Sequence, residues 1–156
     1  MAAISVQRGF RVHHFLLIVF IFLSADLNAQ DCGKTKAYKQ CAYPDDTRFE
    51  NKLNWSKTFR KGQTKQYVLT FFKNRHYYIS VCSKRYNENI HFKIKEDNEN
   101  QDVLYDNAIY ELSGVMEFHM KETKKLIIEI YTPPSRINEA MQRYICVGMR
   151  LFFRKG

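Results

Sequence analysis

Apolar and polar residues alternate along most of the chain after residue 50, and this two-residue period is what most restricts its fold. In NIHFKIKE (residues 89–96), Ile90, Phe92 and Ile94 share one side, and the polar residues between them share the other. A strand with one buried face shows this pattern. The alternation recurs in VMEFHMK (115–121), KKLIIEIYT (124–132) and YICVGMRLFFR (144–154).

Three earlier runs are rich in aromatic and β-branched residues and end at Gly, Asn or charged residues, as strands and their turns do. They are LNWSKTF (53–59), TKQYVLTFF (64–72) and HYYISVCSK (76–84). About eight short strands with almost no helical signal between them predict an all-β fold, an antiparallel β-sandwich of jelly-roll type.

The first 29 residues have the pattern of a secretory signal peptide. Arg8 and Arg11 precede the apolar run FLLIVFIFL, and small residues lead to a cleavage point after Ala29. That run of nine residues is too short to span a bilayer, and no longer one follows. We therefore expect residues 30–156 to form a single secreted domain, periplasmic or extracellular, with no transmembrane segment.

All four cysteines follow the predicted cleavage point, and an even number in a secreted chain suggests two disulfides. Cys82 and Cys146 fall on the strand sides opposite their apolar neighbours, so both are expected on the outer face of one sheet. They can form a disulfide only if the strands at 76–84 and 144–154 lie side by side. We predict this arrangement and the pair Cys82–Cys146, which leaves Cys32 with Cys41.

The segment GKTKAYKQC (33–41) conflicts with that second pair. It could form a short helix that buries Ala37, Tyr38 and Cys41, yet nine helical residues advance about 13 Å, and a disulfide needs Cα atoms within roughly 7 Å. Either the helix is shorter, or the N-terminal segment lies over the outer sheet face and its cysteines exchange partners with Cys82 and Cys146.

The acidic stretch EDNENQD (96–102) stands between two strand-like runs, so a hairpin turn explains it. Asp97, Glu99 and Asp102 are also weak candidates for a calcium site. The EF-hand pattern fails, because no glycine occupies the turn position and Ala108 stands where the bidentate glutamate belongs. No other cofactor is expected. Asp106 and Asn107 could close the second strand in the same way.

No catalytic motif is present, and an enzyme is not expected. His76, His91 and His119 are expected at the surface, and Glu117 and Glu129 in cross-strand ion pairs with lysines. Residues 1–29 hold two arginines and one aspartate, so their removal changes the net charge from +9 to +8. Nucleic acid is not an expected partner, since the lysines are spread along a secreted chain.

The tyrosines and the tryptophan are too many for one core face, so some should be exposed. Trp55, Tyr78, Tyr105 and Tyr110 are the candidate ligand-binding aromatics. The competing interpretation is that such rings cover the outer sheet face beneath the N-terminal segment and the loop TPPSRINEAMQR (132–143). We expect a non-catalytic binding or scaffold protein whose partner is an extracellular or envelope protein. The alternative is a carbohydrate-binding module that stacks glycans on exposed rings.

The succession YVLTF, YYISVC, IHFKIKEDN and VLYDN, closed by CVGMRLFF, resembles secreted bacterial β-sandwich proteins similar to pre-peptidase C-terminal domains. The resemblance covers residues 64–107 best, and then the final strand. It implies a jelly roll without chemistry of its own that binds glycans or proteins. The chain departs from that pattern by lacking the usual glycine in the acidic turn, which counts against a family calcium site, and by carrying four cysteines.

Overall fold

The computed structural model describes residues 32–84, 90–134 and 143–156, so the predicted signal peptide lies outside the described residues. The described residues contain eight strands and three short helical turns. The strands are β1 (Glu50–Arg60), β2 (Thr64–Phe71), β3 (Arg75–Ser83), β4 (His91–Glu96), β5 (Val103–Asp106), β6 (Val115–Met120), β7 (Lys124–Tyr131) and β8 (Tyr144–Lys155). The helical turns are α2 (Cys32–Thr35), η1 (Ala37–Gln40) and η2 (Asn107–Tyr110). No helix among these residues is long and apolar enough to cross a membrane.

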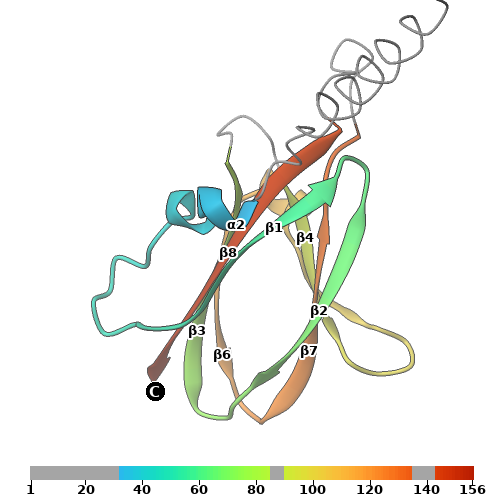
Figure 1. Cartoon of the computed structure of the whole chain (residues 1–156). Coiled ribbons are helices and arrows are strands. Elements are labelled where there is room, and N and C mark those ends of the chain that lie inside the picture. The colour runs from blue at the N-terminus through green and yellow to red at the C-terminus, as the bar shows by residue number, and fades with distance from the viewer. Residues whose placement is uncertain (1–31, 85–89, 135–142) are drawn as a thin grey trace, which may run out of the picture.

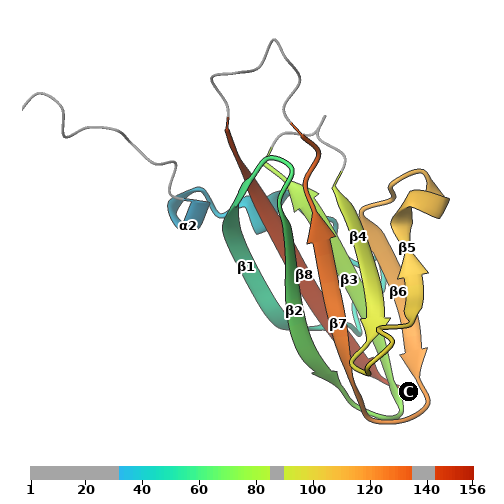
Figure 2. The ribbon, with the colours of Figure 1, turned by 90° about the vertical axis from the view of Figure 1, so that its right-hand side faces the viewer.

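The strands form two four-stranded antiparallel sheets. One sheet has the order β1-β8-β3-β6 and the other has the order β2-β7-β4-β5. This is the strand order of a jelly roll, so the predicted fold class is confirmed. The two sheets face each other in Figure 1. Figure 2 shows that β1 and β2 lie at one side of the sandwich and that β5 and β6 lie at the other.

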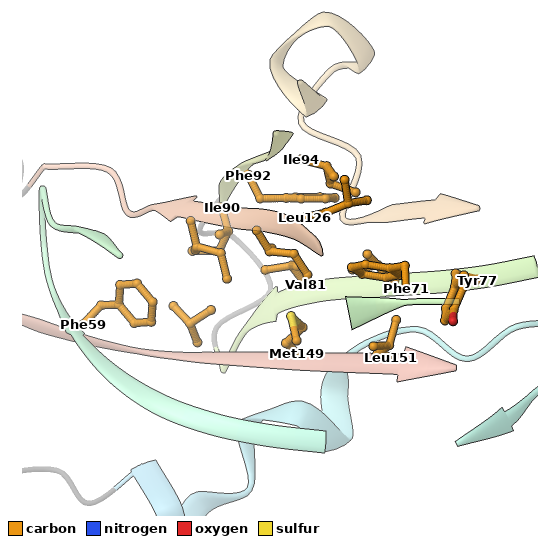
Figure 3. Packing of buried hydrophobic residues seen from close by; sticks show 14 of the residues in the cluster. Phe59, Phe71, Tyr77, Val81, Ile90, Phe92, Ile94, Leu126, Met149 and Leu151 are labelled. Carbon is orange, nitrogen blue, oxygen red and sulfur yellow. The ribbon is translucent and has the colours of Figure 1, made fainter. Parts of the chain in front are cut away.

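The apolar side chains of both sheets meet in one core, as the alternation predicted. Ile90, Phe92 and Ile94 are all buried, and Phe92 lies beside Ile130 of β7 in the register. The inward residues of β8 meet them from the other sheet, where Met149 and Leu151 are buried (Figure 3). The burial of apolar surface between the two sheets is the main contribution to the stability of the sandwich.

The N-terminal segment forms two short turns in place of the predicted short helix. Lys36 has a left-handed backbone (φ 44°) that separates α2 from η1. Ala37 and Cys41 are buried as expected, whereas Tyr38 is only half-buried. Residues 32–49, named the N-terminal strap below, run along the outside of β8 and β3 (Figure 1).

The disulfide pairs are Cys32–Cys146 and Cys41–Cys82, with Cα separations of 5.4 and 5.1 Å. The predicted pairs Cys82–Cys146 and Cys32–Cys41 are therefore wrong, and the exchange of partners beneath an overlying N-terminal segment is correct. The premise that β3 and β8 are neighbours is confirmed, since Cys82 lies opposite Gly148. Both outward cysteines are bridged to the strap, which crosses the sheet above them.

Candidate functional site

The N-terminal strap closes the outer face of the β1-β8-β3-β6 sheet. The Tyr38 N–H donates to the Ser56 hydroxyl of β1 at 3.0 Å, and the Tyr78 hydroxyl of β3 donates to the Tyr43 carbonyl at 3.1 Å. Two disulfides fix the strap to β8 and β3. This face is therefore occupied by the chain itself.

A buried arginine anchors the strap from below. Arg150 on β8 is 2% exposed, and its Nε donates to the Tyr38 carbonyl at 2.6 Å. Its guanidinium carbon lies 3.6 Å from the centre of the Tyr43 ring and 5.4 Å from that of Tyr38. A guanidinium sandwiched by rings and a carbonyl retains favourable partners when it leaves water. Arg150 is thus part of the internal packing.

Two of the four candidate aromatics pack inside the fold. Tyr78 is 8% exposed beneath the strap, as the competing interpretation of these rings held. Trp55 is half-buried, and its ring lies 4.9 Å from that of Tyr67, with Lys57 Nζ above both rings. Their positions favour packing over ligand binding.

The other two candidate aromatics stack at the β5 edge. The rings of Tyr105 and Tyr110 lie 5.3 Å apart and nearly parallel, at 8°. Tyr105 reaches inward to Phe92, whereas Tyr110 is 57% exposed. Tyr110 belongs to a group of exposed apolar side chains on β5 and η2, at the right-hand side of Figure 2. This group, named the β5–η2 surface, comprises Val103 (52% exposed), Leu104 (53%), Ile109 (76%) and Tyr110.

A fully buried asparagine holds the loop that carries this surface. The Asn107 side chain accepts from the Phe92 N–H at 2.8 Å and donates to the carbonyls of Ile90 (2.9 Å) and Ser113 (3.0 Å). The Asn107 side chain thereby supplies hydrogen-bond partners to the backbone of β4 beyond the point where β5 ends. An exposed apolar loop fixed by three hydrogen bonds of a buried side chain is ordered before any partner arrives, which reduces the entropy lost on binding.

The same loop contains two consecutive non-glycine residues in the left-handed region, Glu111 (φ 52°) and Leu112 (φ 57°). Such conformations cost on the order of 1 kcal/mol each and persist where surrounding contacts fix them. Here the Leu112 N–H donates to the Asn107 carbonyl, and the Ser113 N–H donates to the Tyr110 carbonyl, both at 2.9 Å. The turn therefore presents Ile109 and Tyr110 in one defined arrangement.

A polar cluster supports the loop from the outer face of β4. Asp106 lies 2.6 Å from His91 Nε2 and 3.0 Å from Lys93 Nζ, and it accepts from the Ala108 N–H at 2.9 Å. Burial acts to raise the pKa of Asp106, but the hydrogen bonds from Ala108, Lys93 and His91 outweigh it and lower the pKa to about 2. Asp106 and Asn107 do close β5, with Asp106 as the N-cap of η2.

This arrangement gives a pH-dependent prediction for Asp106→Asn. Because the folded pKa is depressed from 3.8 to about 2, the carboxylate stabilises the fold above about pH 4, and this contribution is lost as the pH falls towards 2. The variant should be less stable than the parent by about 1 to 2 kcal/mol near neutral pH and equally stable near pH 2, in urea unfolding. Exposed Glu50→Gln serves as the control, and a pH-independent difference would contradict the assignment.

A histidine oriented by an aspartate can serve as a catalytic base, and His91 lies 2.6 Å from Asp106. The other neighbours of His91 on this face are Lys93, Glu129 and Tyr131, and Asp106 also bonds to Lys93 and to the η2 backbone, which makes the pair part of the packing of β4 and η2. On the other sheet, the rings of His76 and His119 lie 4.6 Å apart, and burial together with Arg154 lowers the pKa of His76. The arrangement of these histidines is that of packed surface residues.

Of the two predicted ion pairs with lysines, that of Glu129 forms, whereas Glu117 lies beside an arginine in place of a lysine. Glu129 of β7 bonds to Lys95 of β4 at 2.8 Å. Glu117 of β6 lies 3.8 Å from an Arg154 nitrogen of β8, on the far side of β3. Glu129 is half-buried between strands, and Gln66 donates to it at 2.7 Å. These contacts join strands within each sheet, which is a structural role.

The weak calcium candidates lie in the exposed turn between β4 and β5. The Asp102 carboxylate accepts from the Asn98 amide at 3.0 Å, and that amide also donates to Glu96. Within residues 32–84, 90–134 and 143–156, no three His, Cys, Asp or Glu side chains are grouped to hold a metal ion. The turn itself is present, and calcium binding by Asp97, Glu99 and Asp102 stays a prediction without a ligand geometry.

Charge is segregated between two segments of the chain. Residues 51–84, which form β1 to β3 apart from Glu50, contain eight Lys and Arg and no Asp or Glu. Residues 97–120, which include β5, η2 and β6, contain six Asp and Glu and no Lys or Arg. The β5–η2 surface therefore lies in an acidic part of a basic protein.

The structural role of Asn107 and this charge segregation are features that the sequence-based reasoning missed. The charge runs are visible in the sequence, and counting charge by segment in place of the whole chain would have found them. The role of Asn107 has no local signal, because its partners Phe92 and Ile90 are 15 and 17 residues away.

No protein-family model and no curated protein matches the chain. Among solved structures, it is similar to Aeromonas hydrophila PliG, a periplasmic lysozyme inhibitor of g-type lysozyme. The match has 12% sequence identity and a TM-score of 0.48, and it covers 65% of this chain and 85% of that one. A likeness of this degree carries no functional argument, so function has to be inferred from the chain's own surface.

Proposed function

We propose that this chain is a secreted, non-catalytic protein that binds another protein through the β5–η2 surface. The observation that carries the proposal is the exposure of Ile109 and Tyr110 on a loop held by the buried Asn107. Folding normally buries large apolar side chains, and a group left exposed on a rigid loop is typical of an interaction site. Aromatic and aliphatic anchors of this kind supply most of the energy of protein interfaces.

Secretion is supported by the signal-peptide pattern and by the disulfides. All four cysteines are paired across the described strands and strap, and none is free. Disulfides persist in the periplasm and outside the cell, where thiols are not kept reduced. A role without catalysis is supported by the packed setting of the histidines and by the internal positions of the cysteines.

A glycan partner is the weaker alternative. Carbohydrate-binding faces present several coplanar rings along one sheet, whereas the exposed rings here are dispersed over the strap, the β2 end, η2 and the β8 start. These are Tyr43, Phe72, Tyr110 and Tyr144. The dispersion favours a protein partner over a glycan chain.

The experiment that tests the proposal compares two crosslinking positions in the mature protein. A photoreactive residue replaces Ile109 or, as the control, Val68, an exposed apolar residue (54%) on β2 at the opposite side. The captured protein is purified, and its affinity is measured by calorimetry. Ile109→Asp should weaken that affinity by roughly 30-fold, as for a hot-spot residue, and Val68→Asp should leave it unchanged. Equal capture at both positions, or unchanged affinity for Ile109→Asp, would refute the proposal.

A further inference from the structure

The exposed acidic side chains around the β5–η2 surface indicate the chemistry of its partner. Asp97, Glu99 and Asp102 precede β5, and Glu111 directly follows Tyr110, so carboxylates flank both ends of the apolar group. All four are exposed, and none forms an ion pair with a cation of the described residues. An apolar centre with a charged rim is the usual anatomy of a protein interface, and the sign of the rim selects the partner.

The lysines nearest to β5 are already paired with other carboxylates, so they do not cancel this local charge. Lys93 Nζ of β4 lies 3.0 Å from Asp106, and Lys95 Nζ of β4 lies 2.8 Å from Glu129. The basic strands β1 and β2 lie at the opposite side of the sandwich (Figure 2). Mobile salt screens exposed charges beyond about 8 Å at physiological ionic strength. The electrostatic interaction of a partner that docks on β5 and η2 is therefore determined more by the nearby carboxylates than by the net positive charge of the whole protein.

Two lysines of the basic strands β1 and β2 bind backbone carbonyls of these strands, which counts against a second copy as the partner. Lys65 Nζ donates to the Thr58 carbonyl of β1 at 2.9 Å, and Lys52 Nζ donates to the Thr70 carbonyl of β2 at 3.1 Å. Lysines placed along edge strands prevent edge-to-edge pairing of sheets. The β5 edge is flanked instead by apolar side chains and carboxylates.

We infer that the protein bound by the β5–η2 surface presents a cationic face, with Lys or Arg around an apolar contact. The inference rests on the proposed function, and it adds the sign of the partner's charge. The carboxylates at the two ends of β5 would contact the basic rim, while Ile109 and Tyr110 fill the apolar centre. This assigns an acidic recognition surface to a protein whose net charge is +9 over the full chain.

The test is a selection of random short peptides displayed on phage against the mature protein, at low ionic strength. Parallel selections use Glu99→Lys/Glu111→Lys, Ile109→Asp and, as the control for position, Glu50→Lys, an exposed acid at the start of β1. Peptides that bind the parent should be rich in Lys and Arg beside apolar residues, although the protein itself is cationic. Their affinity should fall about tenfold or more in the double variant and be unchanged in the Glu50→Lys control.

The other outcomes separate the inference from the proposed function. Peptides that require Ile109 but have no excess of Lys and Arg would overturn the cationic partner and leave the proposed function standing. Peptides that are indifferent to Ile109→Asp would overturn both. Sedimentation velocity gives a further test. If the parent self-associates and the double variant does not, a second copy of the chain binds this surface, and the inference is overturned.

Discussion

Replacing Gly148 with alanine should lower the free energy of unfolding by about 3 kcal/mol, because the strap leaves no room for a methyl group on β8. A Cβ at this position would lie 2.7 Å from the Ala37 carbonyl carbon and would also overlap the backbone nitrogen of Tyr38. Backbone atoms cannot rotate away as a side chain can, and the disulfides hold the strap down on both sides. Urea unfolding followed by Trp55 fluorescence measures the loss.

A double-mutant comparison isolates the contribution of the strap. In the Cys41→Ala/Cys82→Ala background, the strap is free to lift from β3, and Gly148→Ala should then cost roughly half as much or less. An equal loss in both backgrounds would mean that the cost arises within the sheet and not from contact with Ala37 and Tyr38.

Asn107→Ala should cost about 3 kcal/mol, because it leaves two buried backbone groups and one partly buried group without hydrogen-bond partners. These are the Phe92 N–H and the carbonyls of Ile90 and Ser113. The side chain is 0% exposed, so water does not reach these groups without an opening of the loop. Faster hydrogen exchange at the Phe92 amide should accompany the lower stability in urea unfolding.

The control for this prediction is Asn100→Ala in the exposed β4–β5 turn, which should change stability by less than about 0.5 kcal/mol. If the β5–η2 surface depends on its support, Asn107→Ala should also weaken partner binding while Ile109 and Tyr110 remain in place. A variant with parental stability and parental exchange would show that the loop does not need this asparagine.

The fold could be predicted because strand parity is local information. Ile90, Phe92 and Ile94 alternate with polar residues over only five positions, and a half-buried strand is the structure that satisfies such a run. The outward direction of Cys82 and Cys146 followed from the same parity. The proximity of β3 and β8 did not, since it was inferred from a Cys82–Cys146 disulfide that does not form, although the two strands are neighbours. A β-sandwich is a fold that buries the apolar faces of all these strands together.

The disulfide pairing and the binding surface could not be predicted, because each depends on contacts between distant segments. The pairing turned on whether residues 32–49 cross the outer sheet face, and Arg150 and Gly148, which receive them, lie about a hundred residues later. Likewise, Tyr78 and Tyr110 look alike in the sequence. One is covered by the strap, and the other is left exposed by a turn that a distant strand supports.

The connectivity of the strap also imposes an order in time on maturation. Cys146 lies 114 residues after Cys32 and on β8, so in a chain exported as proposed above this bond cannot form until β8 has crossed the membrane. Until then Cys41 is the nearer cysteine in the sequence, and a transient Cys32–Cys41 bond would have to be exchanged later. We therefore expect oxidative maturation to be completed only after β8 is exported, with a yield that depends on an environment that permits disulfide exchange.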